Sequence, residues 1–162
     1  MLAIARTLDE TGDPTPVVRA ALLDLLTSGL LPPGLPPDRA AALTRWAADF
    51  RSRSEDPISE AYQAMLQRRV VLAADGLVIR PDRGTHRRSG AYYTIGPVVR
   101  YMLRRAREYQ PGATSVIDPA CGTGAFLKEA VATYGSQLER CVGWDLDPLA
   151  AAHCQAQVPS AT

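Results

Sequence analysis

Residues 115–126, SVIDPACGTGAF, are the segment that most narrows what this chain can fold into. A short apolar run leads to Asp118, and Gly122 and Gly124 follow before an apolar helical pattern begins. This order is typical of a strand that breaks into a tight turn and then opens a helix. Free backbone N–H groups at such a turn hold small anionic or zwitterionic ligands. The segment therefore predicts a ligand-binding turn.

The same alternation of patterns continues beyond the turn. Residues 125–135, AFLKEAVATYG, predict a helix, residues 141–145, CVGWD, a second strand, and residues 148–157, PLAAAHCQAQ, a second helix. Asp147 directly precedes Pro148 and is expected to cap that helix. A β-α-β-α order predicts an α/β fold with a parallel sheet, to which this part contributes about two strands.

A helical region is predicted ahead of these strands. Apolar periodicity and capping residues predict three helices. The first begins at Pro16, with Asp13 or Thr15 as its cap and Gly29 just past its end, and the others cover residues 39–53 and 58–69. Two β-branched runs joined by Ala-Asp-Gly predict a hairpin at VVLAADGLVIRP, residues 70–81. The basic loop DRGTHRRSG follows the hairpin.

One more helix is predicted in AYYTIGPVVRYMLRRAREY, residues 91–109. Its expected apolar stripe consists of Val98, Val99, Met102, Leu103 and Ala106. Its expected basic face consists of Arg100, Arg104 and Arg107. Gln110-Pro111-Gly112 is expected to end it.

The residues around the turn favour a ligand that contains a nucleoside. Gly122 and Gly124 have no Cβ, so the backbone can come close to a ligand, and the helix opening at Ala125 points its positive dipole end there. Asp145 ends the next strand about 20 residues further on, where a carboxylate accepts hydrogen bonds from ribose hydroxyls. Leu146 would then lie flat against the base.

Two nucleoside ligands compete for this site, a dinucleotide and S-adenosylmethionine. The dinucleotide pattern requires a third glycine, but Leu127 stands at that position. Asp118 would repel a pyrophosphate, whereas it would attract the ammonium or sulfonium of S-adenosylmethionine. The residues favour S-adenosylmethionine, and the alternative is an ordinary tight turn with an acid at its strand end.

These segments resemble a known family in the same order along the chain. DPACGTGAFL is similar to the cofactor-binding motif of adenine-N6-specific DNA methyltransferases, in the branch of type I and combined restriction-modification enzymes. GWDLDPLA resembles their ribose-binding motif, SGAYYTIGPVVRYML their G-x-Y-Y-T-P segment, and DPISEAYQAML a preceding helix. The resemblance covers about residues 55–155 and departs from the family where Ile95-Gly96-Pro97 replaces the common Pro-Pro-Glu.

The resemblance implies a class I methyltransferase fold with a Rossmann-like sheet of seven strands, of which this chain supplies about two. The expected regions are a helical N-terminal region at 1–66, the hairpin and basic loop at 67–90, and a partial S-adenosylmethionine-binding methyltransferase domain at 91–162. The expected cofactor-binding residues are Tyr93, Thr94, Asp118, Ala120, Cys121, Gly122, Gly124, Asp145 and Leu146.

The family's catalytic motif is not found in this sequence. That motif is Asn or Asp followed by Pro-Pro and an aromatic residue. Its polar side chain accepts a hydrogen bond from the adenine amine, and its aromatic ring stacks on the flipped base. The two Pro-Pro pairs, Pro32-Pro33 and Pro36-Pro37, follow leucines and precede Gly34 and Asp38. We therefore expect no catalytic residue in this chain and interpret it as an N-terminal fragment or a truncated reading frame. Half of a split enzyme, completed by a second chain, is the alternative.

The net charge of +1 conceals an arginine-rich segment. Residues 68–107 contain ten arginines and two aspartates, which is +8 and leaves −7 for the rest. A concentration of arginines is typical of proteins that bind a phosphate-bearing partner. The alternative is that these arginines form a solvated helix face. We expect weak DNA binding through Arg68, Arg69, Arg83, Arg87, Arg88 and Arg104.

Several classes of protein are not supported by the composition. No apolar run approaches the roughly 20 residues of a membrane span, and the acidic start, with Asp9 and Glu10, does not resemble a secretory signal. Three cysteines without a C-x-x-C pair predict reduced thiols and a cytoplasmic protein. His153 and Cys154 fit no zinc spacing, so we expect no metal.

Two other functions stay open at this stage. An RNA or protein methyltransferase would share the cofactor fold and differ in its catalytic motif. A truncated module that binds cofactor or DNA would have no enzymatic activity. The DNA sequence downstream of this reading frame would distinguish the first from a DNA methyltransferase, and calorimetry with S-adenosylmethionine would test for a functional cofactor site.

Overall fold

A computed structural model describes residues 13–73, 76–81 and 93–160. The chain divides into two compact units, Met1–Tyr92 and Tyr93–Thr162. Among the described residues, no helix is long and apolar enough to cross a membrane.

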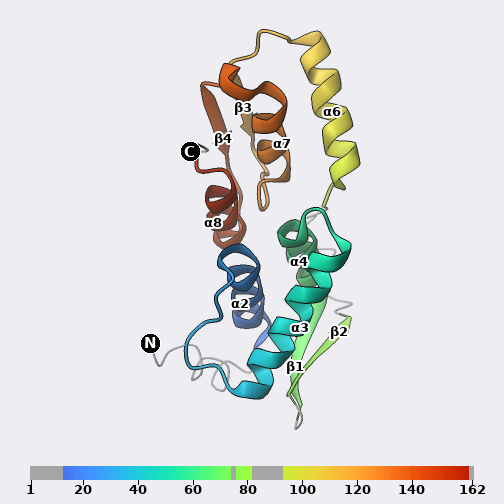
Figure 1. The fold of residues 1–162 in the computed structure, drawn as a ribbon, viewed down its shortest axis with the longest axis vertical. Coiled ribbons are helices and arrows are strands. Elements are labelled where there is room, and N and C mark those ends of the chain that lie inside the picture. Colours follow the sequence, from blue (N-terminus) through green and yellow to red (C-terminus); the bar gives the residue numbers. More distant parts are fainter. Residues whose placement is uncertain (1–12, 74–75, 82–92, 161–162) are drawn as a thin grey trace. The chain divides into compact units, whose positions relative to one another are not determined.

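Three helices form most of the first unit, and they are α2 (Thr15–Ser28), α3 (Pro37–Arg53) and α4 (Pro57–Leu66) (Figure 1). Their inward faces make an apolar core in which Leu22, Leu23 and Leu43 are fully buried. Gly29 ends α2 in the left-handed conformation, with φ 75°, a conformation that glycine adopts most readily.

The starts of these helices differ slightly from the sequence prediction. Helix α2 begins at Thr15 with Pro14 as its N-cap, while the predicted cap Asp13 accepts the Thr15 N–H at 3.0 Å. Helix α3 begins at Pro37, two residues early, because proline is well tolerated in the first turn. Asp56 caps α4 and accepts the Ser59 N–H at 3.3 Å.

The predicted hairpin is present as β1 (Arg68–Ala73) and β2 (Gly76–Pro81), which pair antiparallel. The predicted extension of the third helix to Arg69 is wrong. Arg68 and Arg69 pair with Pro81 and Arg80, so the strand ladder takes these residues and the helix ends at Leu66. The Val70 N–H donates to Thr15 Oγ1 at 2.9 Å, which ties β1 to the start of α2.

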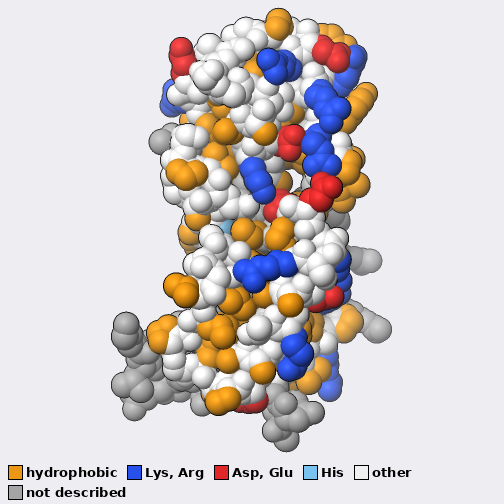
Figure 2. Space-filling view, in the orientation of Figure 1, with side chains coloured by type: hydrophobic (Ala, Val, Ile, Leu, Met, Phe, Trp, Pro, Cys, Tyr) orange, Lys and Arg blue, Asp and Glu red, His pale blue; other side chains and the backbone are white. Residues whose placement is uncertain are grey.

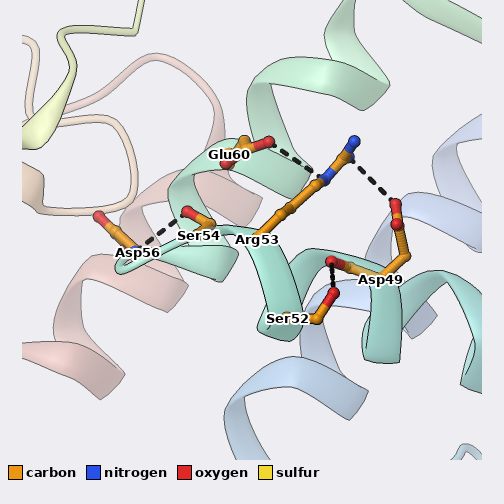
Figure 3. A network of polar contacts seen from close by, with 6 residues as sticks. All are labelled: Asp49, Ser52, Arg53, Ser54, Asp56 and Glu60. Atoms are coloured by element: carbon orange, nitrogen blue, oxygen red, sulfur yellow. Dashed lines mark hydrogen bonds and ion pairs between the residues drawn. The ribbon is translucent and has the colours of Figure 1, made fainter.

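A polar network joins the end of α3 to the start of α4 (Figure 3). The Arg53 guanidinium lies 3.4 Å from Asp49 and 3.4 Å from Glu60. The Asp56 N–H donates to Ser54 Oγ at 3.1 Å in the connection between the helices. The charged side chains are partly exposed, so this network orients the two helices and contributes little stability.

The second unit contains a helix followed by the predicted alternation of strands and helices. Its elements are α6 (Gly96–Tyr109), β3 (Ser115–Asp118), α7 (Ala125–Tyr134), the short helix η1 (Gly135–Gln137), β4 (Arg140–Gly143) and α8 (Pro148–Gln157) (Figure 1). Strands β3 and β4 pair in parallel, from Ser115 opposite Arg140 to Asp118 opposite Gly143. The predicted mixed α/β organisation is therefore confirmed, in the form of two small two-stranded sheets with helices.

Two apolar clusters hold the second unit together. One lies between the strands and helices α7 and α8 and contains Cys121, Leu127, Cys141, Cys154 and Val158. The other joins α6 to α7 through Val99, Leu103 and Ala130. Val116 of β3 packs against both clusters.

The predicted apolar stripe of α6 is only partly correct. Val99 and Leu103 are buried, but Val98 and Met102 are 41% and 49% exposed, and Ala106 is exposed. Within the second unit, α7 packs against this helix in a cluster that Val116 of β3 also joins, and this packing buries a narrower strip of α6 than the periodicity predicts. The helix also begins at Gly96, five residues later than the segment predicted for it.

Candidate ligand-binding site

The glycine turn, residues 119–124, joins β3 to α7. Asp118 ends β3, and its Oδ1 accepts the Ala120 N–H at 3.1 Å. Gly122 and Gly124 both have positive φ, 54° and 97°, which disfavours residues that carry a side chain. The Gly124 N–H donates to the Cys121 carbonyl at 2.8 Å, and the chain then enters α7.

The two glycines of the turn have different surroundings. A Cβ built on Gly122 would meet no atom within 4 Å, so this glycine borders open space. A Cβ built on Gly124 would lie 2.9 Å from Cys154 Sγ and 3.2 Å from Cys154 Cα. There is space for a ligand beside Gly122, and the approach of a ligand there stays a prediction. Gly124 instead allows the turn to pack against α8.

Asp145 lies directly against the glycine turn, although 23 residues separate it from Gly122. Its Oδ2 accepts the Gly122 N–H at 2.8 Å, and its Oδ1 accepts the Asp147 N–H at 2.8 Å. An ionised carboxylate has about four acceptor positions, so two remain for a further donor. The sequence predicted a ribose contact for Asp145 and missed its bond to the turn.

Backbone hydrogen bonds continue the β3–β4 pairing into the site. The Trp144 N–H donates to the Asp118 carbonyl at 2.9 Å, and the Cys121 N–H donates to the Trp144 carbonyl at 2.8 Å. Because β3 and β4 are parallel, their carboxyl ends meet at one edge of the sheet. Asp118 and Asp145 are thus both placed at the edge from which the glycine turn extends.

The other predicted cofactor-binding residues differ in how accessible they are. Leu146 is fully exposed and Ala120 is exposed, so both can meet a ligand. The Cys121 side chain instead points into the apolar cluster, which leaves its backbone for such a role. Tyr93 and Thr94 are half-buried and directly precede Ile95, the N-cap of α6, and their contact with a cofactor stays a prediction.

Three cysteine thiols lie buried beneath the site, and all are free, as the sequence predicted. Burial raises the pKa of the Cys121 thiol to about 12, with Cys154, Asp145 and Asp118 adding to the effect. Burial also raises the pKa of Cys141 and of Cys154. These thiols are neutral near pH 7 and serve in packing rather than as nucleophiles. No group of three potential metal ligands occurs in the part of the chain that the structure describes.

The arginines expected to bind DNA are divided between the two units. Arg68 and Arg69 lie on β1, where Arg69 is 3.9 Å from Asp13, and Arg104 is exposed on α6. Figure 2 shows basic side chains along α6, and those of this helix are all arginines.

Other arginines of α6 already have partners in the protein. Arg105 pairs with Glu108 and lies over the Tyr109 ring, and Arg107 donates to the Thr133 carbonyl. Arg83, Arg87 and Arg88 lie outside the described residues. DNA binding stays a prediction.

Comparison with protein families gives one match. Residues 80–154 match the model of the N-6 DNA Methylase family. This methylase region covers just under half of the chain and contains the glycine turn and Asp145. This region of the chain is therefore similar to N-6 DNA methylases. Searches of curated proteins and of solved structures found no match.

Proposed function

We propose that this chain binds S-adenosylmethionine as part of a site-specific DNA adenine-N6 methyltransferase of a restriction-modification system. The observation that carries the proposal is the bond between Asp145 and Gly122 at the carboxyl edge of the β3–β4 pair, inside the methylase region. It brings together the two segments that resemble the family's cofactor-binding and ribose-binding motifs.

The residues at this edge fit S-adenosylmethionine. The open space beside Gly122 admits a ligand close to the backbone, and α7 directs its N-terminal N–H groups to the same place. Asp145 retains acceptor positions for ribose hydroxyls, and Asp118 carries the charge that complements an ammonium group or a sulfonium. When bound, S-adenosylmethionine supplies an electrophilic methyl group.

We further propose that methyl transfer requires residues from outside this sequence. None of the 162 residues forms the Asn/Asp-Pro-Pro-aromatic motif that accepts the adenine amine. A second polypeptide that carries this motif would complete the enzyme.

Calorimetry on the full 162-residue chain tests cofactor binding. We expect saturable binding of S-adenosylmethionine and of its demethylated product S-adenosylhomocysteine, and none of NAD, because Asp118 repels a pyrophosphate. NAD binding with an affinity equal to or above that of S-adenosylmethionine would contradict the ligand assignment. Absence of binding by all three compounds would contradict the cofactor site itself.

A further inference from the structure

The last turn of α8 contacts the glycine turn through Gln157. Gln157 Nε2 donates to the Thr123 carbonyl at 2.7 Å, across 34 residues of sequence. Thr123 is 4% exposed and Gln157 is half-buried, so water competes poorly for this carbonyl. Gln157 lies beyond the end of the methylase region at residue 154.

Cys154, one helical turn earlier in α8, contacts the same turn. A Cβ on Gly124 would lie only 2.9 Å from its Sγ, and Cys154 shares an apolar cluster with Cys121. Helix α8 thus contacts Cys121, Thr123 and Gly124 of the turn.

The hydrogen bonds of Asp145 and Gln157 together orient the central peptide groups of the turn. Asp145 accepts the Gly122 N–H, and Gln157 donates to the carbonyl of the next residue, Thr123. Glycines with positive φ have many accessible conformations, and a ligand that bound a loose turn would have to order them. A turn that is ordered in advance binds more tightly because this entropy cost is already met.

We propose that Gln157 is a positioning residue that holds the glycine turn in its cofactor-binding conformation. This inference rests on the proposed function, in which the turn binds S-adenosylmethionine. Gln157 acts through the Thr123 carbonyl and does not itself touch the ligand.

The test compares Gln157→Leu with Gln155→Leu in the full chain. Gln155 is the matched control because it lies in the same helix, is exposed, and donates to the nearby Pro159 carbonyl at 3.3 Å. Calorimetry with S-adenosylmethionine measures affinity, and hydrogen exchange without ligand measures opening of the turn at the Gly122 and Gly124 amides. We expect Gln157→Leu to weaken binding roughly three- to tenfold and to speed exchange at both amides. Gln155→Leu should change neither quantity.

A conservative variant separates positioning from general packing. Gln157→Lys keeps a nitrogen donor on a long side chain, so it should restore affinity and slow exchange. Wild-type affinity and exchange in Gln157→Leu would overturn the proposal. Faster exchange spread equally over α6 and β4 would also overturn it, because that result describes a loss of overall stability.

Failure of the proposed function and failure of the positioning role of Gln157 can be distinguished. If the wild-type chain does not bind S-adenosylmethionine, the proposed function fails. Turn-specific exchange in Gln157→Leu would then still support the positioning of the turn by Gln157, and unchanged exchange would overturn it.

Discussion

Asp145 is the residue on which the site most depends. Its carboxylate accepts two backbone N–H groups, from Gly122 in the glycine turn and from Asp147 at the start of α8. The same carboxylate is predicted to accept the ribose hydroxyls. A substitution at this position therefore changes the ligand contact and the support of the turn together.

We expect Asp145→Ala to weaken S-adenosylmethionine binding by about 1.5–3 kcal/mol, as for the loss of a hydrogen bond to a charged group. Calorimetry measures the change. Asp147→Ala is the control, since Asp147 caps α8 by accepting the Leu149 N–H at 3.0 Å. That variant should lose about 1 kcal/mol of folding stability with little loss of affinity. Equal affinity in Asp145→Ala and wild type would contradict the ribose assignment.

The glycines of the turn allow a second comparison. We expect Gly122→Val to lower affinity for S-adenosylmethionine with little loss of helix content, because the new side chain enters the open space beside the turn. Its positive φ adds a folding cost of about 1–2 kcal/mol. Gly124→Ala should instead cost mainly stability, since its Cβ collides with Cys154. Circular dichroism and calorimetry on both variants check this contrast, which fails if Gly122→Val binds as wild type does.

At the scale of elements, α7, β4 and α8 meet in the apolar cluster that contains the three cysteines. The pKa of Cys121 rises from 9.0 to about 12 on folding, chiefly because the thiol is buried. The folded state therefore holds this proton more tightly than the unfolded state does. The stability that the neutral thiol contributes is fully present below pH 9 and is lost as the pH rises from about 9 to about 12.

We expect the free energy of unfolding to fall less steeply with rising pH in Cys121→Ala than in wild type, because the variant has no thiol to ionise at position 121. Urea unfolding at several values between pH 8 and pH 11 measures the difference. In the folded wild type, the thiols should react slowly with an aromatic disulfide reagent near pH 8. Rapid reaction of native Cys121 would contradict its burial in the cluster.

At the scale of the whole molecule, the chain combines a predicted cofactor site with arginines, and its sequence contains no Asn/Asp-Pro-Pro-aromatic motif. The glycine turn and Asp145 lie in the second unit. The arginines expected to bind DNA are found on both units, as Arg68 and Arg69 on β1 and Arg104 on α6. We therefore expect that this chain can bind cofactor and DNA without transferring a methyl group.

We expect the isolated chain to retain DNA weakly at low salt and to transfer no methyl group to it. Retention should fall steeply with salt because phosphate contacts release counterions, and Arg104→Ala should reduce it. Without the aromatic motif no pocket offsets the few kcal/mol needed to unstack an adenine. A tritiated-methyl transfer assay on unmethylated DNA checks the chemistry.

Incorporation above a control without protein would contradict this expectation, provided the preparation is free of host methyltransferases. Activity that appears only when a second polypeptide is added would support the split enzyme. That polypeptide should carry the Asn/Asp-Pro-Pro-aromatic motif.

Local patterns in the sequence determined the order of elements in this protein, the glycine turn after β3 and several helix ends. Asp56 and Asp147 cap α4 and α8 and Gly29 ends α2, because capping involves only neighbouring backbone groups. Periodicity identified α6 as amphipathic, but packing against α7 decided which apolar residues are buried.

Only the tertiary structure decided how the turn is supported. The bonds from Asp145 to Gly122 and from Gln157 to Thr123 join residues 23 and 34 positions apart, and the need for glycine at residue 124 comes from Cys154 of α8. No local pattern encodes these contacts, because each forms only when β4 and α8 have folded back against the turn. Within this one pattern, Gly122 borders open space and Gly124 borders α8, and only the packing around the turn makes the two glycines different.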